Sequence, residues 1–255
     1  MGELEGRGIL ITGGLGAIGR EVVAVLGAAG ARVIVNDVVP PTQVGTPPTG
    51  ALGYVAGDAS ERGEADRLLD EAEALLGGLP HVVCCHAGIV RSAAVLEYEL
   101  EDLEAVWRAN LLAPFALAQA AGRRWVAAGV PGVLVFTGSW VQDVAWPGIA
   151  AYSSSKAALR SMARTFAREL APHRIRANVV APGIVGAGMA LRQWDEDPGY
   201  RARASTAIPL GALQTARSVA DAIAFLAGDR ASYMTGSTLL VDGGASLYPM
   251  DAEPA

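Results

Sequence analysis

Short apolar segments alternate with helical patterns along the whole chain, and this alternation limits the possible folds more than any other feature. The apolar segments are rich in Val, Ile and Leu and cover residues 8–11, 32–36, 53–56, 81–85, 132–137, 175–181 and 237–241. Helix-like stretches lie between them at residues 18–29, 61–76, 100–128, 150–170 and 219–226. Continuous apolar strands that alternate with helices are typical of a parallel sheet covered on both faces. The sequence therefore predicts an α/β fold with a doubly wound, about seven-stranded parallel sheet flanked by helices.

The chain is predicted to form one domain over residues 1–255. No linker rich in Ser or Gly divides it, and hydrophobic residues make up 51% of it, enough for a full core. Residues 187–209 break the alternation because this segment is long, carries mixed charge and contains Pro198. We expect it to be a substrate lid or binding loop.

Charge, apolar run length and cysteine usage exclude several classes of protein. The net charge of −6 argues against a nucleic-acid partner. Every apolar run is too short to span a bilayer, and the first residues lack the apolar stretch of a signal peptide. Cys84 and Cys85 are adjacent and cannot link distant segments, so we expect a cytoplasmic protein. His86 follows Cys85, which would suit a metal site or thiol catalysis. The two cysteines are nevertheless interpreted as buried packing residues, and the sequence shows no cluster of ligands that predicts a metal.

A glycine-rich turn follows the first predicted strand and precedes the first predicted helix. Gly14, Gly16 and Gly19 satisfy the pattern G-x-G-x-x-G. Glycines in such a turn let the backbone approach a pyrophosphate that sits on the helix N-terminus. The turn predicts a dinucleotide site that includes Gly13, Leu15, Gly16, Ala17, Ile18 and Gly19.

Acidic residues follow the second and third predicted strands. Asp37 lies 18 residues after the last glycine of the turn, close to the position of the carboxylate that binds the adenosine ribose. A carboxylate there repels the 2′-phosphate of NADP, and the next residue, Val38, supplies no cation, so NAD is expected rather than NADP. Asp58, next to Ala59, either accepts a hydrogen bond from the adenine amino group or N-caps the helix predicted near residue 61.

Tyr152 and Lys156 lie four residues apart on one predicted helix, so their side chains share a face. An ammonium group near a phenol stabilises the phenolate and lowers the tyrosine pKa, which suits a general acid or base. Ser139 ends the fifth predicted strand, 13 residues before Tyr152, at the edge where open α/β sheets bind ligands. By spacing alone, an ordinary Tyr/Lys pair on a helix is the favoured interpretation.

Taken together, these motifs resemble the short-chain dehydrogenase/reductase family in its compact single-domain branch. The resemblance covers roughly residues 6–247. It is carried by the glycine turn, Asp58, Ala87-Gly88, Asn110, Ser139, Tyr152, Lys156, Pro182-Gly183, Thr235-Gly236 and Val241-Asp242-Gly243-Gly244. It implies one Rossmann-type catalytic domain whose cofactor contacts also include Ala87, Gly88, Tyr152, Lys156, Pro182, Gly183 and Val185.

The resemblance also implies a role for each member of a catalytic set. Tyr152 would be the general base in alcohol oxidation and the general acid in ketone reduction, and Lys156 would lower its pKa and bind the nicotinamide ribose. Ser139 would orient the substrate oxygen, and Asn110 would hold a water in a proton relay that reaches Lys156. The implied reaction is NAD(H)-dependent interconversion of a secondary alcohol and a ketone.

Three positions depart from the family pattern. Ala17 stands where Gly is usual, Cys85-His86 where Asn-Asn is usual, and Ala187 where a Thr commonly contacts the nicotinamide carboxamide. Ala17 is expected to lower cofactor affinity or shift the loop. These departures keep two other hypotheses open: a non-catalytic NAD-binding module and, from the glycine spacing, an epimerase or dehydratase that uses NAD internally.

The substrate is expected to contact Arg91, Ser139, Trp140, Val141, Trp146, Tyr152, Gly183 and Met189, with Gln142 and Asp143 as further polar candidates. The two tryptophans would form a stacking wall for a sugar or ring, or part of a subunit interface. A sugar, polyol or similar hydroxy compound is favoured, and a 3-oxoacyl or hydroxysteroid-type substrate is the alternative. The resemblance also implies a homotetramer that assembles through the helix at residues 150–170 and the C-terminal strand.

Lys156 is the only lysine of the chain, since the other 19 of its 20 basic residues are arginines. Arginine serves wherever a permanent surface charge is enough. The proposed role at residue 156 needs a compact ammonium, which a planar guanidinium replaces poorly.

Overall fold

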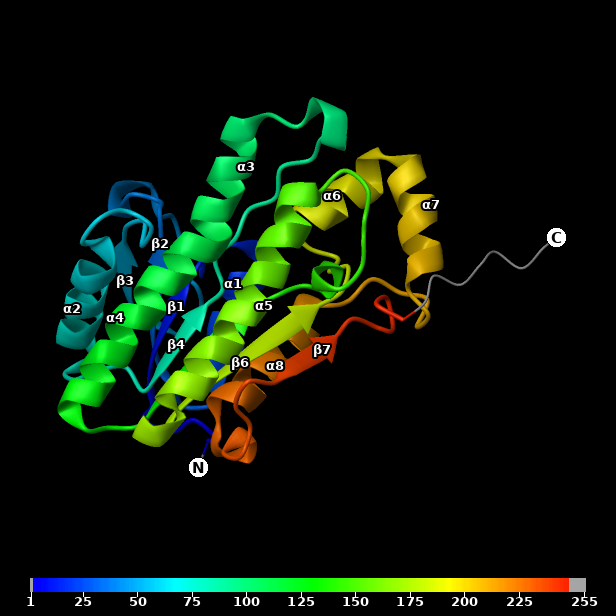
Figure 1. Cartoon of the computed structure of the whole chain (residues 1–255). Helices are drawn as coiled ribbons and strands as arrows, with labels where there is room; N and C mark the ends of the chain where they lie inside the picture. The colour runs from blue at the N-terminus through cyan, green and yellow to red at the C-terminus, as the bar shows by residue number, and fades with distance from the viewer. Residues whose placement is uncertain (1, 248–255) are drawn as a thin grey trace.

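One parallel sheet forms the centre of the molecule (Figure 1). The computed structural model describes residues 2–247, and within them the sheet has seven strands in the order β3-β2-β1-β4-β5-β6-β7. These strands are β1 Gly8–Thr12, β2 Arg32–Asp37, β3 Ala51–Ala56, β4 Val82–Cys85, β5 Gly132–Thr137, β6 Ile175–Pro182 and β7 Thr238–Val241. Every neighbouring pair is parallel, so the predicted fold class is confirmed.

The strand order reverses at β1, which pairs with β2 on one side and with β4 on the other. Loops that follow the carboxyl ends of β1 and β4 therefore separate and leave a crevice, the place where open α/β sheets bind ligands. Thr12 joins the two strand ends, because its Oγ1 accepts hydrogen bonds from the backbone N–H groups of His86 and Ala87 at 3.1 and 3.0 Å.

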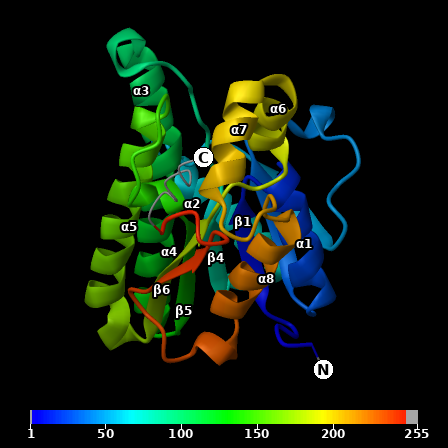
Figure 2. The same ribbon diagram turned by 90° about the vertical axis from the view of Figure 1, so that its right-hand side faces the viewer.

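Helices cover both faces of the sheet (Figure 2). They are α1 Ala17–Ala28, α2 Glu64–Leu76, α3 Leu100–Trp107, α4 Ala113–Ala128, α5 Ala150–Leu170, α6 Gly188–Glu196, α7 Pro198–Ala207 and α8 Ala216–Ala227. Val22 of α1 and Ile223 of α8 belong to the core on one face. Leu69 of α2, Trp125 of α4 and Leu159 of α5 belong to the core on the other face. This two-sided covering explains why the strands are apolar throughout.

The helix predicted at residues 100–128 is interrupted by a π turn. α3 ends at Trp107, the π turn covers Arg108–Leu112, and α4 begins at Ala113. A π turn adds a residue to the helix without ending its apolar face, so the spacing of apolar residues did not reveal it. Asn110 lies in this turn and its side chain is buried.

Residues 187–209, expected to be a substrate lid or binding loop, are mostly helical. α6 and α7 occupy most of the segment (Figure 1). The carboxylate of Asp197 caps α7 by accepting hydrogen bonds from the N–H groups of Gly199 and Tyr200 at 2.8 and 3.0 Å. Pro198 takes the first helical position, where its missing N–H is not needed. The proline that suggested a break therefore begins a helix.

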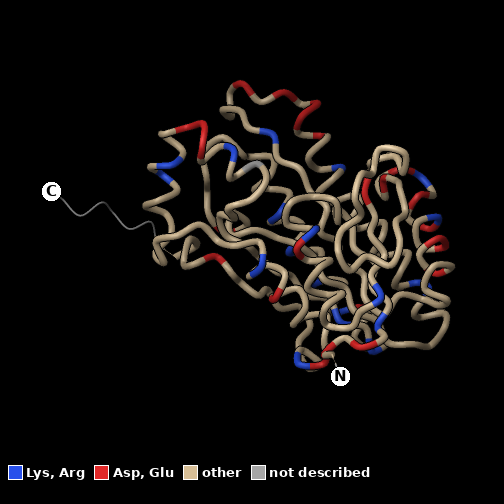
Figure 3. Tube along the Cα trace, turned by 180° about the vertical axis from the view of Figure 1, so that it is seen from behind, with Lys and Arg blue, Asp and Glu red and all other residues tan. Residues whose placement is uncertain are grey.

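Charged residues lie mostly in the outer helices and the connecting loops (Figure 3). Among the helices of residues 2–247, none combines the length and the apolar character needed to cross a membrane.

Candidate active site

The turn between β1 and α1 depends on glycines that leave no room for a side chain. A Cβ on Gly13 would lie 2.8 Å from the Cα of Ala87, and one on Gly19 would lie 2.2 Å from the carbonyl oxygen of Gly13. Gly13 also has a φ of +70°, which favours glycine. Helix α1 begins at Ala17 with no side-chain cap and no acidic residue in its first turn. Its N-terminal N–H groups are therefore available to an anion.

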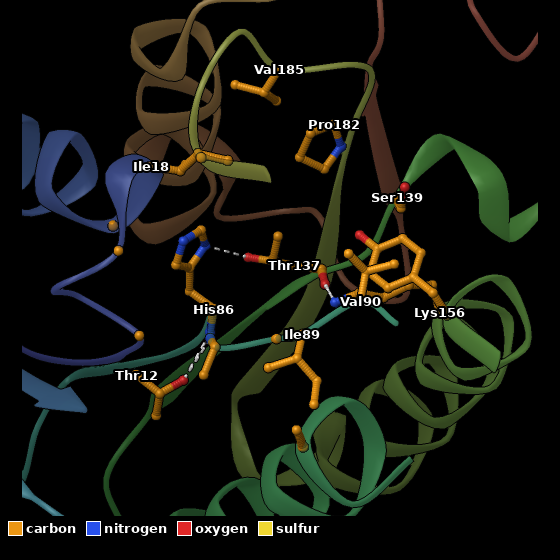
Figure 4. Close-up of a pocket in the computed structure, with 18 of the residues that line it drawn as sticks. Thr12, Ile18, His86, Ile89, Val90, Thr137, Ser139, Lys156, Pro182 and Val185 are labelled. Atoms are coloured by element: carbon orange, nitrogen blue, oxygen red, sulfur yellow. Dashed lines mark hydrogen bonds between the residues drawn. The ribbon is translucent and has the colours of Figure 1, made fainter. Parts of the chain in front are cut away.

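A cavity of about 560 Å³ lies along the carboxyl ends of the strands, from Asp37 past the glycine turn to Tyr152. Figure 4 shows part of its lining, including Ile18, His86, Ser139 and Lys156. Of the predicted cofactor residues, it is lined by Gly13, Gly16, Ala17, Ile18, Gly19, Asp37, Val38, Asp58, Ala59, Ala87, Gly88, Tyr152, Lys156, Pro182, Gly183 and Val185. Leu15 is absent from this lining. A carboxylate, an uncapped helix end and a phenol beside an ammonium succeed one another along the cavity, and this order fits the parts of a nicotinamide dinucleotide.

Asp37 is held in place by the backbone around it. Its Oδ2 accepts a hydrogen bond from the N–H of Leu15 at 3.2 Å, and its Oδ1 accepts one from the N–H of Val38 at 2.9 Å. Leu15 thus supports the carboxylate through its backbone. Each carboxylate oxygen has a second lone pair, so Asp37 can still accept hydrogen bonds from two hydroxyl groups.

Asp58 closes a turn and does not cap a helix. Its Oδ1 accepts a hydrogen bond from the N–H of Ser60 at 2.8 Å. Helix α2 begins three residues later than predicted, at Glu64, after Gly63 with a φ of +82°. The N-cap alternative for Asp58 is therefore wrong, while its place in the cavity lining agrees with the cofactor alternative.

Tyr152, Lys156 and Ser139 meet at one end of the cavity. α5 presents Tyr152 and Lys156 from successive turns, and the Nζ of Lys156 lies 5.5 Å from the centroid of the Tyr152 ring. Lys156 is only 3% exposed, and its Nζ donates a hydrogen bond to the carbonyl oxygen of Thr137 at 2.7 Å. Ser139 follows β5 and lies beside Tyr152 in the cavity lining.

Burial has opposite effects on the pKa values of the two α5 residues. It raises the pKa of Tyr152 above its ordinary value, and the neighbouring Ser139 side chain offsets part of this rise. It lowers the pKa of Lys156 to about 8. Removing either group from water disfavours its charged form. The sequence predicted a lowered tyrosine pKa, whereas desolvation raises it in this structure.

Asn110 supports the site from the π turn. Its Oδ1 accepts a hydrogen bond from the N–H of Ile89 at 2.8 Å, and its Nδ2 donates to the Ile89 carbonyl oxygen at 2.9 Å. The same Nδ2 donates to the Oγ of Ser155 on α5 at 3.1 Å. The amide therefore fixes the segment after β4 relative to the helix that carries Tyr152 and Lys156.

Cys84 and Cys85 are buried in the cores on opposite faces of the sheet. Burial raises the pKa of both thiols, that of Cys84 to about 12, so neither is a ready nucleophile. No group of three ligating side chains within residues 2–247 is arranged to hold a metal ion.

His86 contributes to the cavity, which the sequence did not predict. Its Nδ1 lies 3.1 Å from the Oγ1 of Thr137. The two residues are 51 positions apart, so only the pairing of β4 with β5 brings them together.

Aromatic side chains dominate the end of the cavity expected to hold substrate. The rings of Trp140 and Trp146 pack edge to face with centroids 5.2 Å apart, and Trp146 packs against Tyr200 of α7 at 6.4 Å. The cavity is lined by six of the residues expected to contact substrate, Ser139, Trp140, Val141, Trp146, Tyr152 and Gly183, together with Val90, Ile149, Ile184, Ala187, Ala190, Gln193 and Tyr200. Tyr200 and Gln193 were not singled out, because nothing local showed that their segment is helical.

The other polar candidates lie elsewhere. Arg91 is exposed and pairs with Asp102 of α3 at 3.5 Å. Asp143 pairs with Arg160, and Gln142 is buried with no hydrogen-bond partner for its amide among the described residues. The side chain of Met189, also predicted to contact substrate, lies outside the described part of the structure.

The chain has relatives along nearly its whole length. Residues 14–246 match a family model described as enoyl-(acyl carrier protein) reductase. Glucose 1-dehydrogenase of Gluconobacter oxydans (strain 621H) is 32% identical over 96% of this chain and 94% of its own length. 3beta-hydroxysteroid dehydrogenase 1 of Eggerthella lenta is 32% identical over 97% and 96%, respectively. A solved gluconate 5-dehydrogenase from Burkholderia cenocepacia J2315, in complex with NADP and tartrate, has a TM-score of 0.87 at 28% identity, covering 96% of this chain and 97% of that one.

Proposed function

This chain belongs to the short-chain dehydrogenase/reductase family, and we propose that it is an NAD(H)-dependent oxidoreductase that interconverts a secondary alcohol and a ketone. The observation that carries the proposal is the placement of Ser139, Tyr152 and Lys156 at one end of the cavity that begins at Asp37. A bound nicotinamide would supply the hydride chemistry, and the chain would supply position and proton transfer.

Tyr152 is the proposed general acid and base. In ketone reduction its hydroxyl donates a proton to the substrate oxygen, and Ser139 holds that oxygen by a hydrogen bond. Because burial keeps the pKa of Tyr152 high, the phenol carries its proton at neutral pH, as an acid must. In alcohol oxidation the same oxygen accepts the proton, and the ammonium of Lys156 stabilises the phenolate. We assign Asn110 the positioning of a water that connects Lys156 to solvent.

Asp37 supports NAD as the cofactor, although the solved gluconate 5-dehydrogenase holds NADP. We expect kcat/KM with NADH to exceed that with NADPH, because the carboxylate accepts ribose hydroxyls and repels a 2′-phosphate. Asp37→Asn keeps an oxygen for the backbone donors and removes the charge. It should reduce the preference for NADH by about tenfold or more, as measured by initial rates with both cofactors.

Asp221→Asn is the matched control, because Asp221 is an exposed carboxylate of α8 that pairs with Arg217 at 2.8 Å, away from the cavity. This variant should keep the wild-type preference. A wild-type enzyme that works better with NADPH would contradict the role given to Asp37.

The cavity lining bears on the choice between the candidate substrates. The glucose 1-dehydrogenase relative supports the sugar or polyol that the sequence favoured. The wall of Trp140, Trp146 and Tyr200, however, offers large apolar surfaces and few polar groups. A polyol would leave many hydroxyl groups without partners there, which is costly in an enclosed site. This observation favours the alternative, a bulky apolar alcohol or ketone of the hydroxysteroid type.

We expect ring-bearing apolar secondary alcohols to give a kcat/KM about tenfold or more above that of glucose or sorbitol. Trp146→Ala should raise KM for the preferred ring-bearing alcohol about tenfold while leaving kcat/KM for 2-propanol within about twofold. 2-Propanol has no ring to pack against Trp146, so it serves as the internal control. A preference for polyols in the wild type would favour the sugar candidate.

Three further features complete the proposal. α6 and α7 would act as the substrate lid within a single catalytic domain, since Ala190, Gln193 and Tyr200 reach the cavity. An apolar groove beside Trp107, Leu112 and Phe115, which α5 lines with Ala158 and Met162, supports assembly into a homotetramer that uses α5. The two free cysteines support a reducing, cytoplasmic location.

A further inference from the structure

His86 is a polar side chain in the cavity to which the proposed mechanism gives no role. Its backbone N–H is fixed by Thr12 at 3.1 Å, and the Nδ1 of its ring lies 3.1 Å from the Oγ1 of Thr137. Figure 4 shows the ring between Ile18, at the start of α1, and Thr137. The imidazole therefore lies between the glycine turn and the catalytic end.

The other ring nitrogen of His86, Nε2, is free to bind a ligand. No hydrogen bond to Nε2 is found among the described residues, and this atom is not sealed within the protein, since the ring lines the cavity. Burial and the nearby Lys156 lower the pKa of His86 to about 4, so the ring is neutral at physiological pH. A neutral imidazole has one donor and one acceptor nitrogen. With Nδ1 engaged by Thr137, Nε2 can make one directed hydrogen bond into the cavity.

Thr137 links this nitrogen to the catalytic set. Its side-chain hydroxyl contacts His86, and its carbonyl oxygen accepts the hydrogen bond from the Nζ of Lys156 at 2.7 Å (Figure 4). One residue of β5 thus fixes both polar groups relative to each other. Lys156 is proposed to bind the nicotinamide ribose, so His86 is placed to contact the adjoining part of the same molecule.

We propose that the Nε2 of His86 forms a hydrogen bond with an oxygen of the nicotinamide-side ribose or of the nicotinamide-side phosphate of the bound dinucleotide. This inference rests on the proposed function for the cofactor itself. His86, which stands where asparagine is usual in the family, would make a cofactor contact specific to this chain. Thr137 would hold the imidazole ring in position for that contact. The adenosine half, near Asp37 and Asp58, is not involved.

Two substitutions distinguish a cofactor-binding role of His86 from a purely structural role. His86→Asn places an amide near the position of Nδ1, so it keeps the Thr137 contact and loses Nε2. His86→Gln reaches as far as Nε2 and loses the Thr137 contact. We expect His86→Asn to weaken NADH binding about tenfold with an unchanged Tm, and His86→Gln to bind NADH within about threefold of the wild type with a lowered Tm. The reverse pattern would overturn the proposal.

The binding measurement is a fluorescence titration of the full chain with NADH, and AMP serves as a second probe. His86→Asn should leave the affinity for AMP unchanged, because AMP occupies only the adenosine half. His173→Asn, at an exposed histidine, is the matched control. An equal loss for AMP and NADH would overturn the assignment to the nicotinamide half.

Nitrogen NMR tests the contact without any substitution. The chain has only three histidines, so ¹⁵N-labelled imidazoles give few signals. Adding NADH should shift the Nε2 resonance of His86, and adding AMP should leave it in place. An unshifted Nε2 under saturating NADH would overturn the inference and leave the proposed function intact. Failure of the wild type to bind NADH at all would instead refute the proposed function, and the inference with it.

Discussion

Tyr152→Phe is expected to lower kcat by about 10²- to 10⁴-fold, because it removes the hydroxyl that transfers the proton and leaves the ring in place. The phenol is buried beside Ser139 and Lys156. The affinity for NADH should change little, since the glycine turn and Asp37 are untouched. The rate is followed by the absorbance of NADH and the affinity by fluorescence titration.

Tyr233→Phe is the control for this prediction. Tyr233 is fully exposed and remote from the cavity lining, so its variant should keep wild-type rates. Retained turnover in Tyr152→Phe would exclude Tyr152 as the acid and base. A wild-type protein that binds NADH yet turns over no alcohol or ketone from a broad panel would support the non-catalytic module instead.

The strands could be predicted from the sequence because their signal is local. An apolar run bounded by helices indicates a buried parallel strand, and the structure has a strand at each of the seven predicted places. The glycine turn could be predicted for the same reason, since its glycines are required by contacts within the turn and with the neighbouring strand end.

The features that the sequence missed depend on contacts between distant segments or on geometry that leaves the pattern unchanged. The π turn at Asn110 keeps the apolar face of its helix, so periodicity did not detect it. His86 meets Thr137 only because β4 pairs with β5. Tyr200 reaches the cavity only because Pro198 begins a helix. The raised pKa of Tyr152 comes from burial, which the spacing of Tyr152 and Lys156 cannot reveal.

Lys156→Arg is expected to lower kcat/KM by about 100-fold or more, even though the charge is kept. The Nζ lies 2.7 Å from the carbonyl oxygen of Thr137, and a Cβ on Gly88 would come within 3.3 Å of it. A planar guanidinium is larger than the ammonium and does not fit that space. NADH binding should weaken as well, since the displaced group would enter the cofactor cavity. Arg160→Lys, on the same helix and paired with Asp143, is the control and should keep wild-type rates.

Chemical modification tests the same residue in the unaltered chain, because Lys156 is its only lysine. The pKa of Lys156 is lowered to about 8, so its neutral, reactive form accumulates as the pH rises through 8, well below the ordinary value for lysine. An amine-selective reagent should therefore inactivate the enzyme increasingly across that range, and NADH should protect by filling the cavity that Lys156 lines. Peptide mass mapping separates Lys156 from the N-terminal amine, whose reference pKa is similar. Full turnover by protein that is quantitatively modified at Lys156 would remove this residue from the mechanism, whereas inactivation that follows its modification would show that the single ammonium is required.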